Sequence, residues 1–276
     1  LFFVFQPPGA WVGAASLSMG VVVESIATRL MAIGSVRKLL RTGEGKGRDA
    51  EDADDYEELT YRRILRFYYP LALTSLIGLA AQPMMTFFMG RAPAPVESLA
   101  VFPVVISLNF IFRSMGLSFQ EVGIALMGRH HQHFRPLARF AFFLAVGAAG
   151  TLGVVAFTPL ADVWFITVSG LTPELARYAI LPTMILVPIP FLSVLLSFQR
   201  GILVLDRRTR PITIATALEV AGIALVFPLL GWKSGMVGVT AAAVSILLGR
   251  LAANTFLLAP CRRALASSAE RRGSQH

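Results

Sequence analysis

The chain contains 276 residues, of which 55% are hydrophobic and only 15% are charged, and its formal net charge is +9. An average soluble domain carries about 25% charged residues, so this composition excludes an ordinary soluble protein and indicates lipid as the solvent. The basic residues are spread over several connecting segments rather than gathered on one face with stacking aromatic residues, which argues against nucleic acid as a partner.

Seven segments are apolar and long enough to span a bilayer, which takes about 20 helical residues each. They predict an all-α membrane protein. In chain order, the predicted spans cover residues 11–33, 67–89, 96–125, 137–157, 178–205, 211–230 and 235–258.

The spans predict four parts of the chain: a single helix ending at residue 33, a cytoplasmic linker over 34–65, a six-helix lobe over 66–260 and a cytoplasmic tail over 261–276. The linker includes GEGKGRDAEDADDYEEL, which is polar throughout and has no apolar period that could bury a face. A calcium site is the alternative there, but the acidic residues lack the spacing of a calcium-binding loop. Because the chain opens with LFFVF and no initiator methionine, we expect it to be a fragment whose residues 1–33 end an N-terminal lobe.

Loops rich and poor in lysine and arginine alternate along the chain. The connections near 34–66, 129–139 and 207–210 and the tail near 262–272 are basic, whereas each connection between them holds at most one basic residue. This alternation follows the positive-inside rule. We therefore expect a multi-pass protein of the cytoplasmic (plasma) membrane, with the linker and the C-terminus in the cytoplasm.

Four prolines predict breaks in spanning helices, because proline donates no backbone hydrogen bond and clashes with the preceding turn. Interrupted helices inside a membrane occur where protein or a watery cavity satisfies the freed backbone groups, and they often mark transporter sites. A static kink is the alternative for any one of them. The predicted breaks lie at Pro83, Pro103, Pro188 and Pro190.

Charged residues within the predicted spans should face protein or water, because each costs at least about 2.5 kcal/mol near the bilayer centre. Two interpretations stay open: structural ion pairs, such as Arg113 with Glu219, or a cavity that binds a charged substrate or a coupling ion. The residues predicted to line such a pathway are Gln82, Asn109, Arg113, Gln120, Glu121, Arg200, Glu219 and Arg250. Arginines outnumber acids in this set, three to two, which favours an anionic substrate because a guanidinium binds phosphate or carboxylate with two donors.

The sequence gives no support for an enzyme. None of the four histidines lies in a predicted span, although a membrane metalloenzyme needs ligands at depth, and no phosphate-binding P-loop occurs. We expect no metal site and no cofactor, with coupling to H⁺ or Na⁺ left open.

Two stretches resemble the second lobe of the multidrug/oligosaccharidyl-lipid/polysaccharide (MOP) exporter superfamily: RFYYPLALTSLIGLAAQPMMTFFMGRAPAPVESLAVFPVVISL and the elbow FQRGILVLDRRTRPIT. The resemblance covers about 66–258. It implies a two-lobed transporter of twelve helices, with 11–33 as helix six and 67–258 as helices seven to twelve, that works by alternating access. The superfamily includes cation-coupled MATE drug exporters, lipid-linked sugar flippases and the progressive ankylosis family, which is associated with anion export. Segment 67–89 lacks the carboxylate that drug exporters use there as a cation ligand, which argues against their standard coupling site.

Together these observations predict a secondary active transporter or flippase that exports a small or lipid-linked substrate, with an anion favoured. Its predicted partners are the lipid bilayer, the transported substrate and an N-terminal lobe of the same protein. A cation-coupled multidrug antiporter is the alternative within this class. A non-transporting membrane scaffold is the alternative from another class.

Overall fold

The computed structural model describes residues 9–43, 61–128 and 132–273, and these residues form helices and connections with no strand among them. The chain divides into two compact units, Leu1–Leu59 and Thr60–His276. Six of the described helices are long and apolar enough to cross a membrane, and a bent pair of helices makes a seventh span when it is counted as one. The predicted all-α membrane fold with seven spans is therefore confirmed.

The first unit contains one described helix, α2 (Gly9–Gly43), with an apolar stretch at Ala14–Gly34. The sequence predicts its end at residue 33, but the helix continues to Gly43, so the first residues of the predicted linker are helical. Half of the added residues are arginine, lysine or leucine, which favour helix, and no proline lies among them. Residues 44–60 of the predicted linker lie outside the described residues.

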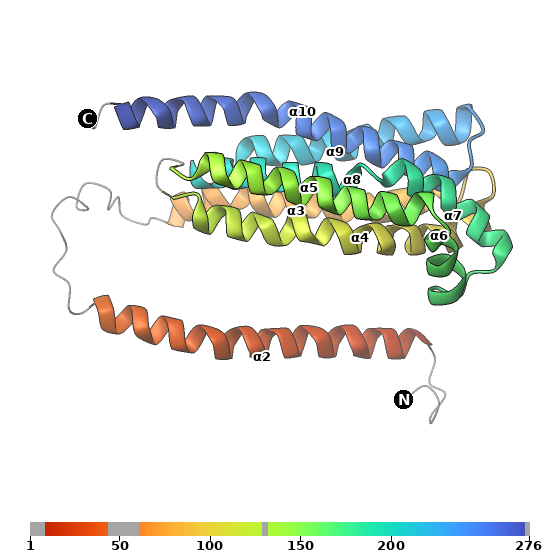
Figure 1. Ribbon diagram of the computed structural model, residues 1–276, viewed down its shortest axis with the longest axis horizontal. Helices are drawn as coiled ribbons and strands as arrows, with labels where there is room; N and C mark the ends of the chain where they lie inside the picture. Colours follow the sequence, from red (N-terminus) through yellow and green to blue (C-terminus); the bar gives the residue numbers. More distant parts are fainter. Residues whose placement is uncertain (1–8, 44–60, 129–131, 274–276) are drawn as a thin grey trace. The chain divides into compact units, whose positions relative to one another are not determined.

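The second unit is a bundle of helices (Figure 1). Its helices are α3 (Tyr61–Met89), α4 (Pro95–Leu126), α5 (Phe134–Phe157), α6 (Leu160–Asp162), α7 (Pro173–Leu186), α8 (Ile189–Leu205), α9 (Arg210–Phe227) and α10 (Gly238–Gly273), with π-helical turns η3 (Val163–Val168) and η4 (Pro228–Lys233). The predicted cytoplasmic tail is thus largely helical, because α10 runs on to Gly273.

The connection predicted over residues 158–176 is more ordered than a loop. It contains α6 and η3, and α7 begins at Pro173, within the predicted connection. Thr172 caps α7, since its hydroxyl accepts a hydrogen bond from the Leu175 amide at 3.4 Å, and Pro173 occupies the first turn, where no amide partner is needed.

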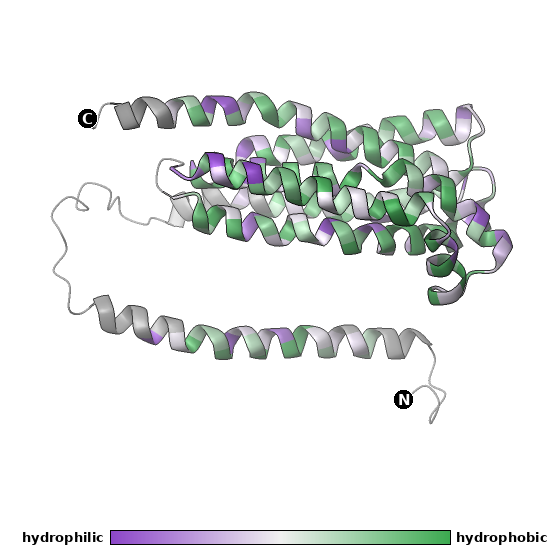
Figure 2. Ribbon diagram, viewed as in Figure 1, coloured by the Kyte–Doolittle hydropathy of each residue, from purple (hydrophilic) through white to green (hydrophobic). Residues whose placement is uncertain are grey.

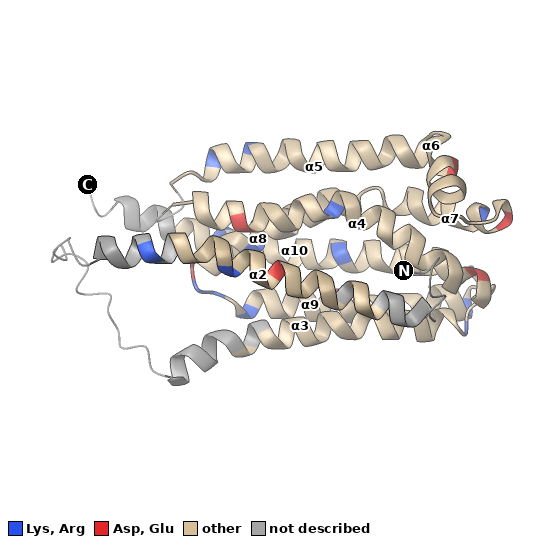
Figure 3. Cartoon of the chain, turned by 90° about the horizontal axis from the view of Figure 1, so that it is seen from below, with Lys and Arg blue, Asp and Glu red and all other residues tan. Residues whose placement is uncertain are grey.

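Apolar side chains cover the outside of this bundle as well as its interior. On α5, Phe140, Phe143 and Val154 are all more than half exposed. Figure 2 shows α5 as hydrophobic over most of its length, and Figure 3 shows few charged residues along the middle of the helices. A soluble protein rarely exposes so much contiguous apolar surface, whereas a lipid-facing bundle does.

The four predicted helix breaks behave differently. α3 continues through Pro83 and α4 continues through Pro103, so neither proline ends its helix. A lone proline removes one donor, and the rest of the helix can hold the chain together. Between Leu186 and Ile189, at Pro188, the chain instead bends by 41° and divides one span into α7 and α8.

Glycines set how closely two helices of the bundle approach. A Cβ atom at Gly116 of α4 would lie 2.9 Å from the amide nitrogen of Val194 in α8, so only glycine permits this contact. Two glycines of α5 do not act in this way: a Cβ at Gly147 or Gly150 would meet nothing within 4 Å. The α4–α8 contact places α4 side chains beside those of α8, where the candidate site lies.

Candidate functional site

A cavity of about 390 Å³ lies within the second unit, between α3, α4, α8, α9 and α10. Six of the eight predicted pathway residues line it: Gln82, Asn109, Arg113, Arg200, Glu219 and Arg250. These six residues come from five helices. The cavity therefore brings together side chains that lie up to 168 positions apart in the sequence, from Gln82 to Arg250.

The other two predicted pathway residues, Gln120 and Glu121, do not line the cavity. Gln120 shares a helix face with Arg113, but seven residues place it about 10 Å further along α4, beyond the cavity. Glu121 is turned about 100° from that face and is exposed. Shared periodicity places residues on one face of a helix but not at one depth.

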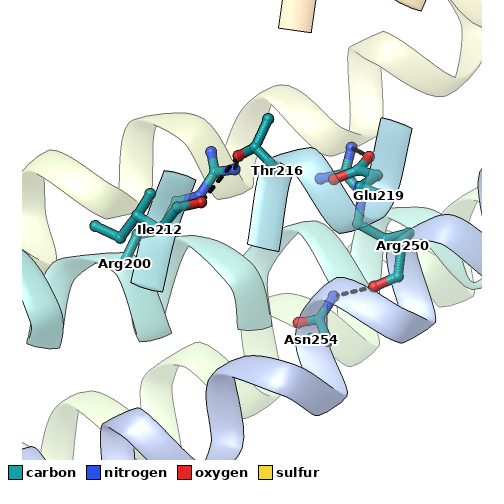
Figure 4. A network of polar contacts seen from close by, with 6 residues as sticks. All are labelled: Arg200, Ile212, Thr216, Glu219, Arg250 and Asn254. Carbon is teal, nitrogen blue, oxygen red and sulfur yellow. Dashed lines mark hydrogen bonds and ion pairs between the residues drawn. The ribbon is translucent and has the colours of Figure 1, made fainter. Parts of the chain in front are cut away.

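Glu219 and Arg250 form an ion pair that joins α9 to α10. The Arg250 Nη2 atom lies 2.8 Å from the Glu219 Oε1 atom, and each side chain is 12% exposed. Figure 4 shows the two side chains facing each other. The pairing of Arg113 with Glu219, offered from the sequence as an example, is therefore wrong, since Arg250 occupies the carboxylate.

The close approach of α9 and α10 explains why this pair forms. A Cβ at Gly249 would lie 2.7 Å from the backbone oxygen of Glu219, and a Cβ at Gly222 would lie 3.4 Å from the Cα of Gly249. Small residues at such a crossing let two membrane helices come into backbone contact. Arg250 follows Gly249 directly, so the crossing holds the guanidinium beside the carboxylate.

Arg200 and Arg113 approach the cavity from α8 and α4 and form no ion pair with a carboxylate of the described residues. An Arg200 Nη2–H donates to the Thr216 hydroxyl at 3.0 Å, and that hydroxyl donates to the Ile212 carbonyl at 3.1 Å (Figure 4). The Arg113 guanidinium lies 5.7 Å from the centre of the Phe110 ring. The Nε atoms of both arginines are buried without a hydrogen-bond partner in the described part of the chain.

Asn109 supports the bend between α7 and α8. Its Nδ2–H donates to the Leu186 carbonyl at 3.1 Å. In a continuous helix that carbonyl would accept from the residue four positions on, which is Pro190 and has no N–H. Asn109 therefore replaces a missing backbone donor, and it lines the cavity at the same time.

Three hydroxyl residues also line the cavity, although they are absent from the predicted site: Thr74, Ser75 and Thr216. Thr74 donates to Thr213 across the α3–α9 contact, at 3.0 Å. For Thr216, the sequence did indicate a place in the cavity, because Thr216 and Glu219 are three residues apart and so share one face of α9.

A wider apolar groove of about 910 Å³ adjoins the cavity, between α3 and α4. Its lining includes Met89, Leu99, Pro103 and Phe110. Three residues line both spaces: Gln82, Phe102 and Ile106. A polar cavity and an apolar groove therefore share one boundary.

Among the described residues, no group of three or more histidine, cysteine, aspartate or glutamate side chains is arranged to hold a metal ion. His130 and His131 of the sequence GRHHQHFR lie outside those residues.

No protein-family model and no curated protein matches the chain. Solved structures do match it. They include a MATE transporter in complex with MaD3S (20% identity, TM-score 0.55), which aligns with 70% of this chain and 44% of its own. A MOP superfamily transporter from Pyrococcus furiosus aligns at 18% identity and a TM-score of 0.54, over 70% of this chain and 43% of its own. An inward-facing multidrug resistance MATE transporter aligns at 20% identity and a TM-score of 0.52, over 70% and 44%.

These matches show the fold. The chain has the fold of MATE transporters of the MOP superfamily, and it spans less than half the length of the transporters that it matches, consistent with their C-terminal lobe. The predicted likeness to this superfamily is confirmed at that level.

Proposed function

We propose that this chain is the C-terminal lobe of a secondary active transporter or flippase that moves an anionic substrate across the cytoplasmic membrane by alternating access. The observation that carries the proposal is the charge of the cavity, where three arginines face a single carboxylate. An N-terminal lobe of the same protein completes the transport pathway.

The charge balance favours an anion over a cation. Glu219 neutralises Arg250, which leaves Arg113 and Arg200 as two guanidinium groups that face the cavity without a carboxylate. Charged side chains in a span are expensive unless they face water, a partner or a ligand. A phosphate or carboxylate accepts two parallel hydrogen bonds from one guanidinium, so an oxyanion matches these groups.

The same charges disfavour the two alternatives. A cationic drug would meet net positive charge in this cavity, and a multidrug antiporter would need an additional acidic site. A scaffold without transport does not require arginines that lack a carboxylate partner inside the bundle, because apolar residues at those positions would pack with a lower free-energy cost.

Pocket polarity also varies among the similar structures. The Pyrococcus furiosus transporter is described as having a binding pocket of reverse polarity, which suggests a different function for that protein. A change of substrate charge is therefore compatible with this fold, and the fold alone does not imply drug export.

A lipid-linked anion is the second candidate substrate, and the apolar groove between α3 and α4 favours it. Because the groove and the cavity share Gln82, Phe102 and Ile106, one molecule could place a charged group among the arginines and a hydrocarbon chain along α4. A small anion needs only the cavity.

Transport by the full-length protein in proteoliposomes tests the proposal. Citrate, pyrophosphate, a lipid-linked phosphate and a cationic dye are offered in turn, under imposed H⁺ or Na⁺ gradients and in both directions. We expect anion movement that falls at least about tenfold in Arg113→Gln and Arg200→Gln, since each removes a charge-assisted contact.

Arg91→Gln is the matched control, because Arg91 is exposed and its guanidinium stacks on Phe87, at 4.1 Å from the ring centre, outside the cavity. Anion transport that is indifferent to Arg113 and Arg200, or movement of the dye alone, would contradict the proposal. Movement of the lipid-linked phosphate without citrate or pyrophosphate would select the flippase.

A further inference from the structure

We infer that Glu219 is a built-in competitor of the anionic substrate for Arg250, and that substrate binding releases its carboxylate to take up one proton. This inference rests on the proposed anion site and assigns its coupling residue. The proton comes from the surrounding solution, as hydronium or from a buffer acid, and is held on a Glu219 carboxylate oxygen while the anion is bound to Arg250.

Among the described residues that line the cavity, Glu219 is the only carboxylate. Its Oε1 atom already makes the contact that an oxyanion would make, at 2.8 Å from Arg250 Nη2. The carboxylate is therefore a tethered equivalent of the ligand, and an incoming anion that binds Arg250 has to displace it.

The surroundings decide what happens to the displaced carboxylate. The charged groups facing Glu219 from the helices around the cavity are Arg250 from α10, Arg113 from α4 and Arg200 from α8, while α3 contributes the hydroxyls of Thr74 and Ser75. Once a dianion engages the arginines, the carboxylate loses its partner and gains a negative neighbour within the cavity. Both changes favour the protonated acid.

Protonation and anion binding then promote each other. A protonated Glu219 no longer holds Arg250, so the anion binds more tightly, and by linkage the bound anion favours the protonated acid to the same extent. Proton and anion would therefore occupy the carrier together and cross in the same direction.

The crossing of α9 and α10 connects this exchange to the positions of two helices. Glu219 and Arg250 lie at the point where Gly249 meets the α9 backbone, so the pair is one of the contacts that fix the crossing. Replacing the carboxylate by a diffusible anion removes a covalently anchored contact between the two helices and leaves them joined by packing alone.

The test is calorimetric titration of the full-length protein in nanodiscs with sulfate, which stays a dianion between about pH 5 and about pH 8, where carboxylates and histidines titrate. Titration in buffers of different ionisation enthalpy counts the protons taken up. We expect wild-type affinity to rise as the pH falls, by up to about tenfold per pH unit for one linked proton, with uptake approaching one proton per sulfate.

Glu219→Gln should bind sulfate about tenfold more tightly than wild type at neutral pH, with no proton uptake and no pH dependence. Glu174→Gln is the matched control: Glu174 is exposed in the first turn of α7 and does not line the cavity, so proton uptake should equal that of wild type. If Glu219→Gln fails to fold, Glu219→Asp serves instead and should retain proton uptake, with tighter sulfate binding because the shorter side chain holds Arg250 less well.

The outcomes separate this inference from the function on which it rests. Sulfate binding that ignores both pH and Glu219, without proton uptake, would overturn the proton link and leave the anion site standing. Failure of every variant to bind sulfate at every pH would overturn the anion site and this inference with it.

Discussion

Two walls of the cavity hold their arginines in opposite ways. In the α9–α10 wall, formed by Glu219, Gly249 and Arg250, the guanidinium is paired with a carboxylate at a tight glycine crossing. In the α4–α8 wall, formed by Asn109, Arg113 and Arg200, the guanidinium groups are not paired with a carboxylate in the part of the chain that the structure describes, and the wall adjoins a bent span.

The difference teaches what each wall responds to. In the α9–α10 wall the ion pair persists until one of its two charges is neutralised or displaced. Protonation of the carboxylate or an incoming anion therefore acts on this wall. An unpaired wall exerts its attraction at all times and supplies the standing positive charge of the cavity. In the transporter proposed above, one wall attracts the anion and the other couples its arrival to a proton.

The largest effect is expected when the paired wall loses one partner. Arg250→Gln removes the ion-pair partner of Glu219, whose side chain is only 12% exposed, and removal of one partner of a buried pair costs up to about 3–5 kcal/mol. We expect a lower midpoint of thermal unfolding in detergent together with loss of sulfate binding.

The double variant Glu219→Met with Arg250→Met sharpens this result. It removes both charges, so stability should return to within about 1–2 kcal/mol of wild type while sulfate binding stays weak. If Arg250→Gln alone is as stable as wild type, the ion pair is solvated, and the two walls do not differ in how strongly they hold their arginines.

A smaller effect is expected at the glycine crossing. Gly249→Ala places a methyl group 2.7 Å from the Glu219 carbonyl oxygen, and such overpacking costs about 2 kcal/mol. Gly147→Ala on α5 is the control, because its Cβ would meet nothing within 4 Å, and helix propensity should make it neutral or slightly stabilising. Equal unfolding midpoints for the two variants would contradict the tight crossing.

The smallest effect is expected in the α4–α8 wall. Asn109→Leu removes the donor to the Leu186 carbonyl and leaves that buried acceptor unsatisfied, at a cost of about 1 kcal/mol. The Arg113 and Arg200 charges remain, so sulfate affinity should change by less than about threefold, which is under 1 kcal/mol. A much larger loss of affinity in a folded Asn109→Leu protein would show that Asn109 itself contacts the anion.

The spans were predictable because apolar runs of bilayer length carry their own signal. Helix ends were not: α2 continues to Gly43 past its apolar residues, and α10 continues through Pro260 to Gly273, so neither end follows from the length of the apolar run. Arg113, Glu219 and Arg250 were predicted to line one pathway, and all three line the cavity.

The ion pair could not be assigned from the set of predicted pathway residues alone. Arg113 and Arg250 both line the cavity that contains Glu219, and helix order around the bundle decides which of them reaches the carboxylate. Consecutive helices joined by a short connection are usually neighbours, and α9 and α10 are such helices, so the chain order contained the better signal. The roles of Asn109 and Thr216 depend on partners from other helices, which periodicity within one helix does not identify.

The bend at Pro188 has a consequence for movement. Proline at 188 and at 190 deprives the carbonyls of Met184 and Leu186 of their usual donors, and the structure supplies the Val187 amide at 3.3 Å and the Asn109 side chain at 3.1 Å in their place. A span interrupted in this way can change its angle by exchanging one side-chain hydrogen bond worth about 1 kcal/mol, without breaking an intact helical ladder. The break at Pro188 therefore provides a hinge between the two halves of that span. The hydrogen bond from Asn109 of the neighbouring helix α4 restrains this hinge.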